Sequence, residues 1–292
     1  MLRKKQYPVY FILPGIFLFV MFFIVPFLVG FRYSFTNWNF KRADFIGLEN
    51  YISILKNPNM SIAFKNTFLF TMVTTVGKVS IGMLLAVLLN RKLKTTNYLR
   101  TVFYLPAVVN SIAVGIVFTS LMHPSKGLIN TALRTIGLTG FQPKWLTDTS
   151  IAMLSICFIE IWKWSGYTMM ILLAGMQNIS KDYYEAAIMD GATKVQRILH
   201  IDLPGIKSTI IMLLILQMGS LMNVGFEKVF LLQNDLNMSA SDVINTYVYR
   251  VGLVQNNYSY STAVGLFNSV INMALVIAAN QLSKKLANES LW

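Results

Sequence analysis

Residues 183–206 read YYEAAIMDGATKVQRILHIDLPGI, a polar and amphipathic stretch that separates two long apolar runs. The pattern predicts two short helices joined by a turn. Ser180 can cap the first helix, and Gly191 can end it at little conformational cost. Apolar side chains then recur on one side of the second helix, at Val195, Ile198 and Leu199. The stretch is the least bilayer-like part of the second half of the chain.

Composition places the rest of the chain in a membrane. Hydrophobic residues make up 55% of its 292 residues, charged residues make up only 13%, and the mean hydropathy is +0.55. These values exclude an ordinary soluble domain. A transmembrane helix needs about 20 apolar residues. The sequence therefore predicts an all-α, polytopic membrane protein with six transmembrane helices, in the runs 10–31, 67–90, 102–122, 150–175, 206–227 and 261–282.

Basic residues orient the six predicted helices. Arg3, Lys4 and Lys5 precede the first run, which shows no small-residue cleavage site, so we expect a retained helix and not a signal peptide. Basic residues are denser in the segments that become cytoplasmic when both termini are inside, and the positive-inside rule therefore predicts two cytoplasmic termini. The stretch 183–206 then lies in the cytoplasm. The formal net charge of +13 is explained without nucleic acid as a partner.

Periodicity alone leaves open whether this cytoplasmic stretch only lies on membrane lipid headgroups. Its motif is more specific. It consists of Glu185-Ala186-Ala187, three further residues, Gly191, nine further residues and then Ile201-Asp202-Leu203-Pro204. This pattern resembles the EAA loop of binding-protein-dependent ABC importer permeases. The resemblance implies a type I ABC importer fold whose loop 180–206 forms cytoplasmic coupling helices on a partner ATPase. The coupling residues that it implies are Tyr184, Glu185, Ala186, Ala187, Asp190, Gly191, Leu203 and Pro204.

A second resemblance concerns the N-terminal part of the chain. Three segments carry it: residues 33–38 (YSFTNW), residues 47–51 (GLENY) and Asn66-Thr67. They are similar to the first outer loop of maltose-type permease subunits in carbohydrate importers. Within that group, the whole sequence resembles the oligosaccharide-importing members. We therefore expect residues 1–66 to form an N-terminal helix and first outer loop. Residues 67–292 would form a permease core with five transmembrane helices.

The resemblance also implies partners. These are a second homologous permease subunit, two cytoplasmic ATPase subunits, an extracytoplasmic solute-binding protein and a sugar or oligosaccharide, all at a bacterial cytoplasmic membrane. The chain contains no G-x-x-x-x-G-K-[ST] sequence, and Gly77-Lys78-Val79-Ser80 lacks the required upstream residue. We therefore expect a membrane transport subunit and not an enzyme, without a cofactor of its own, and with ATP and Mg²⁺ on the partner ATPase.

Polar side chains inside the apolar runs mark a candidate substrate pathway, because they are costly in hydrocarbon and usually face a bundle interior. They are Lys78, Glu160, Lys163, Gln217, Asn223, Asn268 and Asn272. Glu160 and Lys163 lie one helical turn apart, so one interpretation is a structural ion pair. The other is that Lys163 and the aromatic residues around it contact substrate, since flat rings suit sugar faces.

The resemblance to maltose-type permeases implies which positions contact sugar. They are Lys163, Trp164 and Tyr167 before the loop, and Gln217, Ser220, Leu221 and Val224 after it, with Asn223 adjacent. Leu221 and Val224 stand where that family shows asparagines, which argues against maltose itself. A lysine in such a site can pair with a carboxylate, and we therefore hypothesise an acidic, uronate-containing oligosaccharide.

Two other classes of protein remain as alternatives. An ion-coupled secondary transporter would use Glu160 or Lys78 as a relay, but it gives no reason for the spacing from Glu185 to Pro204. A membrane-embedded transferase would need paired acidic residues at the membrane surface, and the acidic residues that cluster there belong to the loop motif. His123 and His200 have no metal-ligating neighbours at suitable spacing, so we expect no metal site.

Overall fold

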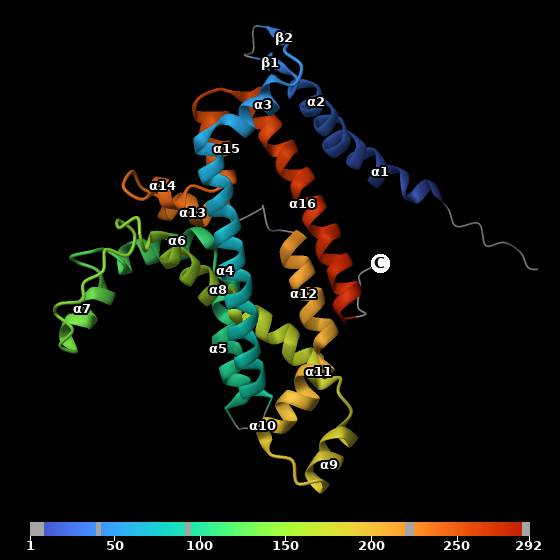
Figure 1. The fold of residues 1–292 in the computed structure, drawn as a ribbon, viewed down its shortest axis with the longest axis vertical. Helices are drawn as coiled ribbons and strands as arrows, with labels where there is room; N and C mark the ends of the chain where they lie inside the picture. Colours follow the sequence, from blue (N-terminus) through green and yellow to red (C-terminus); the bar gives the residue numbers. More distant parts are fainter. Residues whose placement is uncertain (1–8, 39–41, 91–94, 220–224, 288–292) are drawn as a thin grey trace, which may run out of the picture. The chain divides into compact units, whose positions relative to one another are not determined.

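The computed structural model describes residues 9–38, 42–90, 95–219 and 225–287, and most of these residues are helical (Figure 1). The chain divides into two compact units. The first comprises Met1–Asn57 with Val248–Ser269, and the second comprises Pro58–Tyr247 with Val270–Trp292. The candidate functional residues in the apolar runs and in the 180–206 loop belong to the second unit, apart from Asn268.

The first unit begins with an apolar helix. Its described elements are η1 (Val9–Phe11), α1 (Leu13–Phe19), the π-helical η2 (Val20–Ile24), α2 (Val25–Tyr33), β1 (Thr36–Trp38), β2 (Ala43–Phe45), α3 (Glu49–Lys56), η4 (Arg250–Val254) and the first part of α16 (Tyr258–Ala287). The segment Leu13–Tyr33 has a mean hydropathy of 2.5 and buries none of its most apolar window within the chain. A helix so apolar and so exposed requires lipid or another apolar protein surface around it.

A short antiparallel ribbon is an exception within the predominantly helical chain that the sequence predicts. Strand β1 pairs with β2 in a register that places Thr36 opposite Phe45 and Trp38 opposite Ala43. The side chain of Asn50, from α3, donates hydrogen bonds to the carbonyls of Ser34 (2.7 Å) and Thr36 (3.1 Å). The two motifs that marked the first outer loop, YSFTNW and GLENY, therefore contact one another directly.

The second unit contains the long helices. Its elements are α4 (Pro58–Leu89), α5 (Thr96–Val108), α6 (Ser111–Leu121), α7 (Leu128–Thr135), α8 (Ala152–Gln177), α9 (Lys181–Met189), α10 (Lys194–Arg197), the π-helical η3 (Ile198–Asp202), α11 (Leu203–Gly205), α12 (Lys207–Gly219), α13 (Phe226–Leu232), α14 (Met238–Ser241), α15 (Ile244–Tyr249) and the end of α16. Threonines on α4 donate to carbonyls one turn back, such as Thr67 to Ala63 at 2.7 Å, and so satisfy their hydroxyls within an apolar helix.

Four helical segments are long and apolar enough to cross a membrane: Leu13–Tyr33, Pro58–Leu89, Ala152–Gln177 and Tyr258–Lys285. They match four of the six predicted runs. Two further pairs of helices pass the same test only when each pair is taken together, with bends of 96° at α5–α6 and 58° between Lys194–Gly205 and Lys207–Gln217. The described residues thus provide four spans, or up to six if each bent pair is one span.

The break between α5 and α6 divides the predicted run 102–122. Asn110 adopts an extended conformation, with ψ of 136°, and its side chain accepts a hydrogen bond from the backbone N–H of Ile112 at 2.8 Å. This contact caps α6 as a separate helix. Pro106 lacks a backbone donor near the end of α5 and weakens that helix further. The other bend lies between Gly205 and Lys207, at the start of the predicted run 206–227, and α12 forms the first part of that run. Residues 220–224 lie outside the described residues.

Helix α8 organises the core of the second unit by packing along α4 and α5. Its buried side chains contribute to two apolar clusters, one around Ile156 and Ile159 and the other around Met169, Leu172 and Met176. The predicted core cysteine, Cys157, is 1% exposed in the first cluster, which confirms its packing role. In hydrocarbon such helices are held by close packing more than by the hydrophobic effect, so small residues at crossings are important.

Gly166 provides the closest of these crossings. A Cβ atom added there would lie 1.9 Å from the backbone oxygen of Phe103 on α5. We predict that Gly166→Ala forces α5 away from α8 and destabilises the protein by about 1–3 kcal/mol. The apparent melting temperature of the purified protein in detergent measures this effect.

The matched control is Gly265→Ala on α16, where an added Cβ would meet nothing within 4 Å. This substitution should leave the melting temperature unchanged or slightly raised, because alanine favours helix more than glycine does. Equal melting temperatures for the two variants would show that the α5–α8 crossing is looser than described.

Candidate functional site

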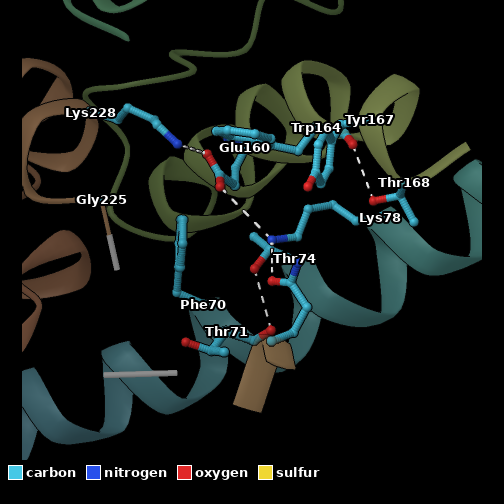
Figure 2. Close-up of a pocket in the computed structure, with 11 residues that line it drawn as sticks. Phe70, Thr71, Thr74, Lys78, Glu160, Trp164, Tyr167, Thr168, Gly225 and Lys228 are labelled. Atoms are coloured by element: carbon cyan, nitrogen blue, oxygen red, sulfur yellow. Dashed lines mark hydrogen bonds and ion pairs between the residues drawn. The ribbon is translucent and has the colours of Figure 1, made fainter. Parts of the chain in front are cut away.

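A polar cavity of about 300 Å³ lies within the second unit, among its apolar helices (Figure 2). Helices α4 and α8 supply most of its wall, Gln217 enters from α12 and Lys228 from α13. The lining residues are Phe70, Thr71, Thr74, Lys78, Glu160, Trp164, Tyr167, Thr168, Gln217, Gly225 and Lys228. Its size is at the lower end of the range for small-molecule sites.

Three charged side chains meet in this cavity, each from a different helix. One carboxylate oxygen of Glu160 pairs with the ammonium group of Lys228, and the other lies 3.9 Å from that of Lys78. The Lys78 ammonium also donates to the side-chain oxygen of Gln217 at 3.0 Å. The three charged side chains are only 9–12% exposed. Buried charges persist only when paired, so this Lys78–Glu160–Lys228 cluster fixes the spacing of α4, α8 and α13.

Two aromatic side chains of α8 border the charged cluster. The rings of Trp164 and Tyr167 lie 5.7 Å apart at 89°, in an edge-to-face arrangement. The ammonium of Lys228 lies 5.5 Å from the centre of the Trp164 ring, within cation–π range. The cavity therefore combines apolar ring faces with hydrogen-bonding and charged groups, which is the combination that recognises a polar ligand with some apolar surface.

Lys163 does not pair with Glu160, and that interpretation is wrong. Lys163 is 2% exposed, and its ammonium donates to the hydroxyl of Ser111, at the start of α6, at 2.8 Å. It is absent from the lining of the cavity, although its ammonium lies 5.7 Å from the centre of the Trp164 ring. Glu160 instead finds its partners on other helices, because lysines from α4 and α13 point toward it from across the cavity.

The structure brings together part of the predicted substrate pathway. Trp164, Tyr167 and Gln217 line the cavity, whereas Ser220, Leu221, Asn223 and Val224 lie outside the described residues. The sequence interpretation missed Lys228, because this residue follows the last predicted position of the 206–227 run. A charged residue one position beyond an apolar run was the only available signal.

The stretch 183–206 folds with two short helices, α9 and α10, around a glycine turn, as predicted. The Ser180 hydroxyl accepts a hydrogen bond from the backbone of Asp182 at 3.3 Å and caps α9. Gly191 follows α9 with φ of +75°, a left-handed conformation that favours glycine. Thr193 and Gln196 then form a capping box at the start of α10, which the T-x-x-Q spacing signals but the sequence interpretation overlooked.

A hydrogen bond joins the two halves of this loop. The hydroxyl of Tyr184 on α9 donates to the carboxylate of Asp202 at the end of η3, at 2.5 Å, and Asp202 is buried. Burial raises the pKa of Tyr184, and the hydrogen bond and negative charge of Asp202 raise it further. The hydroxyl therefore keeps its proton throughout the physiological pH range and remains a donor.

The opposite side of the loop exposes apolar side chains. Met189 is 87% exposed, and the other large exposed residues are Tyr183, Ile188, Val195 and Leu199. Glu185 and Ala186 are also exposed, whereas Ala187 is half-buried. Large exposed apolar side chains gathered in one loop are typical of interaction surfaces. Across the described ranges, no group of three or more His, Cys, Asp or Glu side chains is placed to hold a metal ion.

Comparisons with known proteins agree with these features. Residues 78–288 match the family described as "Binding-protein-dependent transport system inner membrane component". Over its whole length, covering 92% of each relative, the chain is 36% identical to protein LplB and 32% identical to the polygalacturonan/rhamnogalacturonan transport system permease protein YteP, both from Bacillus subtilis (strain 168).

A solved structure also resembles this chain. It is a chain of a bacterial alginate ABC transporter in complex with a periplasmic protein that carries an alginate pentasaccharide. The likeness has a TM-score of 0.88 at 30% identity, and it covers 97% of this chain and 95% of the other. It supports the expected type I importer permease fold, while the number of spans stays between four and six.

The matched family explains the apolar helices and gives no support to an ion-coupled transporter or a membrane transferase. Its members are transport subunits and not enzymes, and its name places them in the inner membrane. With its family match, full-length relatives and shared fold, this chain belongs to the binding-protein-dependent inner membrane components, the multi-pass permease subunits of ABC importers.

Proposed function

We propose that this permease imports an oligosaccharide that carries carboxylate groups. The observation that carries the proposal is the cavity in which Lys78 and Lys228 flank a single carboxylate, Glu160, beside Trp164 and Tyr167. The transport functions of similar proteins support it. One relative transports polygalacturonan and rhamnogalacturonan, and the structural neighbour transports alginate, an acidic polysaccharide.

In this proposal the two lysines of the cavity take the role that the sequence interpretation gave to Lys163. Their ammonium groups would hold a sugar carboxylate by charge-assisted hydrogen bonds. Trp164 and Tyr167 would present ring faces and edges to the sugar, and Gln217 would contact its hydroxyls. The residues at positions 220, 221, 223 and 224 remain proposed contacts from the resemblance to maltose-type permeases.

The remaining parts of the transporter follow from the family. We propose a second homologous permease subunit, two cytoplasmic ATPases that bind ATP and Mg²⁺, and an extracytoplasmic binding protein that delivers the sugar, with both termini of this chain in the cytoplasm. Helices α9 and α10 would dock on an ATPase through the EAA residues and the exposed apolar side chains around Met189. Helix α8 ends at Gln177, three residues before the cap of α9, and so connects the cavity to the loop.

Substitution of Lys228 by glutamine tests the substrate class. We predict that Lys228→Gln lowers ATP-dependent uptake of a galacturonate trisaccharide by about 10- to 100-fold, because Glu160 then has Lys78 as its remaining partner and the cavity loses its net positive charge, a loss comparable to a charged hydrogen bond of about 1.5–3 kcal/mol. Uptake of the methyl-esterified trisaccharide should change much less. Both rates are measured in proteoliposomes that contain the complete transporter and its binding protein.

Lys163→Gln is the matched control, since Lys163 lies outside the lining of the cavity. Any loss that it causes should be the same for the acidic and the esterified sugar. Equal losses for both sugars in Lys228→Gln would contradict the proposed recognition of a carboxylate.

Substitution of Gly191 tests the coupling role of the loop. Gly191→Pro cannot adopt a φ of +75° and loses the backbone hydrogen bond to the carbonyl of Ile188. We predict that it abolishes sugar-stimulated ATP hydrolysis by the reconstituted complex while the subunits still assemble, and that Glu185→Lys does the same by placing the opposite charge on the docking surface.

Gly191→Asn is the control for this experiment, because asparagine tolerates the left-handed conformation and keeps its backbone donor. It should retain most of the stimulated activity. Normal stimulation in Gly191→Pro and Glu185→Lys would show that the loop lies on lipid and does not couple the subunits.

A further inference from the structure

We propose that Glu160 is an internal competitor for the carboxylate of the substrate. It neutralises the cavity lysines when the cavity is empty. When a sugar enters, one of these lysines pairs with the sugar carboxylate instead of with Glu160. This inference rests on the proposed import of acidic oligosaccharides and adds a mechanism for releasing them.

The two contacts of Glu160 differ in strength. Its carboxylate makes a direct hydrogen-bonded ion pair with Lys228, whereas its other oxygen lies 3.9 Å from the Lys78 ammonium, beyond hydrogen-bond distance. Lys78 directs a hydrogen bond to the neutral side chain of Gln217 instead. Lys78 is therefore the cation that a second carboxylate can engage while the Glu160–Lys228 pair stays intact (Figure 2).

The charge of the cavity favours one additional anion. Two ammonium groups and one carboxylate leave one formal positive charge among side chains that are about nine-tenths buried. Solvent screens such a charge weakly, so an anion of single charge is attracted into the cavity. With a volume of about 300 Å³, the cavity accommodates a short segment of the oligosaccharide and binds one carboxylate at a time.

Glu160 also limits how tightly that carboxylate binds. Because it is attached to α8, its effective concentration beside the lysines is high and constant. When the sugar leaves, Glu160 remains as the counter-charge, and the membrane interior does not have to hold two unpaired ammonium groups. A transporter must release what it binds, and a built-in competitor lowers the affinity for acidic sugars without altering contacts to the sugar ring.

Two substitutions change the charge of the cavity in opposite directions at nearly constant shape. Glu160→Gln removes the competitor, and Gln217→Glu adds a second carboxylate at the position that accepts a hydrogen bond from Lys78. The experiment measures the equilibrium Kd of a galacturonate trisaccharide and of its methyl ester for the complete transporter in lipid nanodiscs, without nucleotide or binding protein. We expect Glu160→Gln to lower the Kd of the acidic sugar about tenfold and Gln217→Glu to raise it about tenfold. The methyl ester is the reference sugar, because a lost contact to the sugar ring raises both Kd values alike, whereas the charge effect changes the ratio of the two Kd values about tenfold in opposite directions in the two variants.

The outcomes separate this inference from the proposed function. If the wild-type transporter binds the acidic sugar, but its Kd is unchanged in Gln217→Glu or rises in Glu160→Gln, the competitor role is refuted and the substrate class stands. If the wild-type protein binds the ester as tightly as the acid, the proposed substrate class fails together with the inference. Should Glu160→Gln not assemble, the Gln217→Glu measurement decides alone.

Discussion

The pairing of buried charge in an apolar environment is the constraint on which the rest of this structure depends. A carboxylate among membrane-spanning helices must have cationic partners, and Glu160 takes them from two other helices, 82 and 68 residues away in sequence. The Lys78–Glu160–Lys228 cluster therefore connects α4, α8 and α13 and at the same time creates the polar cavity. Under the proposed function, the groups that hold these helices together would also supply the charge for the ligand.

Close packing around α8 complements this polar contact. Gly166 lets the backbone of α5 approach α8, and α8, from Ala152 to Gln177, contributes buried side chains to two apolar clusters. The same helix leads into the loop whose halves are joined by Tyr184 and Asp202. Under the proposed function, this helix would link the sugar cavity along its length to the ATPase that docks on the loop after its end.

Much of this arrangement was predictable from the sequence, and the physical reasons for the exceptions are specific. Long apolar runs with few charged residues, such as those of α4 and α8, predicted helices, and the loop motif predicted the turn at Gly191. Pro106 and Asn110 signalled the break between α5 and α6, but the apolar run across them concealed it. The ion pair of Glu160 could not be found locally, since its partners come from distant segments, and the nearby Lys163 was the more obvious but incorrect choice.

Binding of a carboxylate by Lys78 or Lys228 is the central claim of this account. The most direct measurement is an electron cryomicroscopy map of the complete transporter with a galacturonate trisaccharide trapped in the membrane. The account predicts a sugar carboxylate within hydrogen-bond distance of one of these two ammonium groups, with the sugar beside Trp164 and Tyr167. A sugar bound elsewhere along the helices, or bound here with its carboxylates turned away from both lysines, would contradict it.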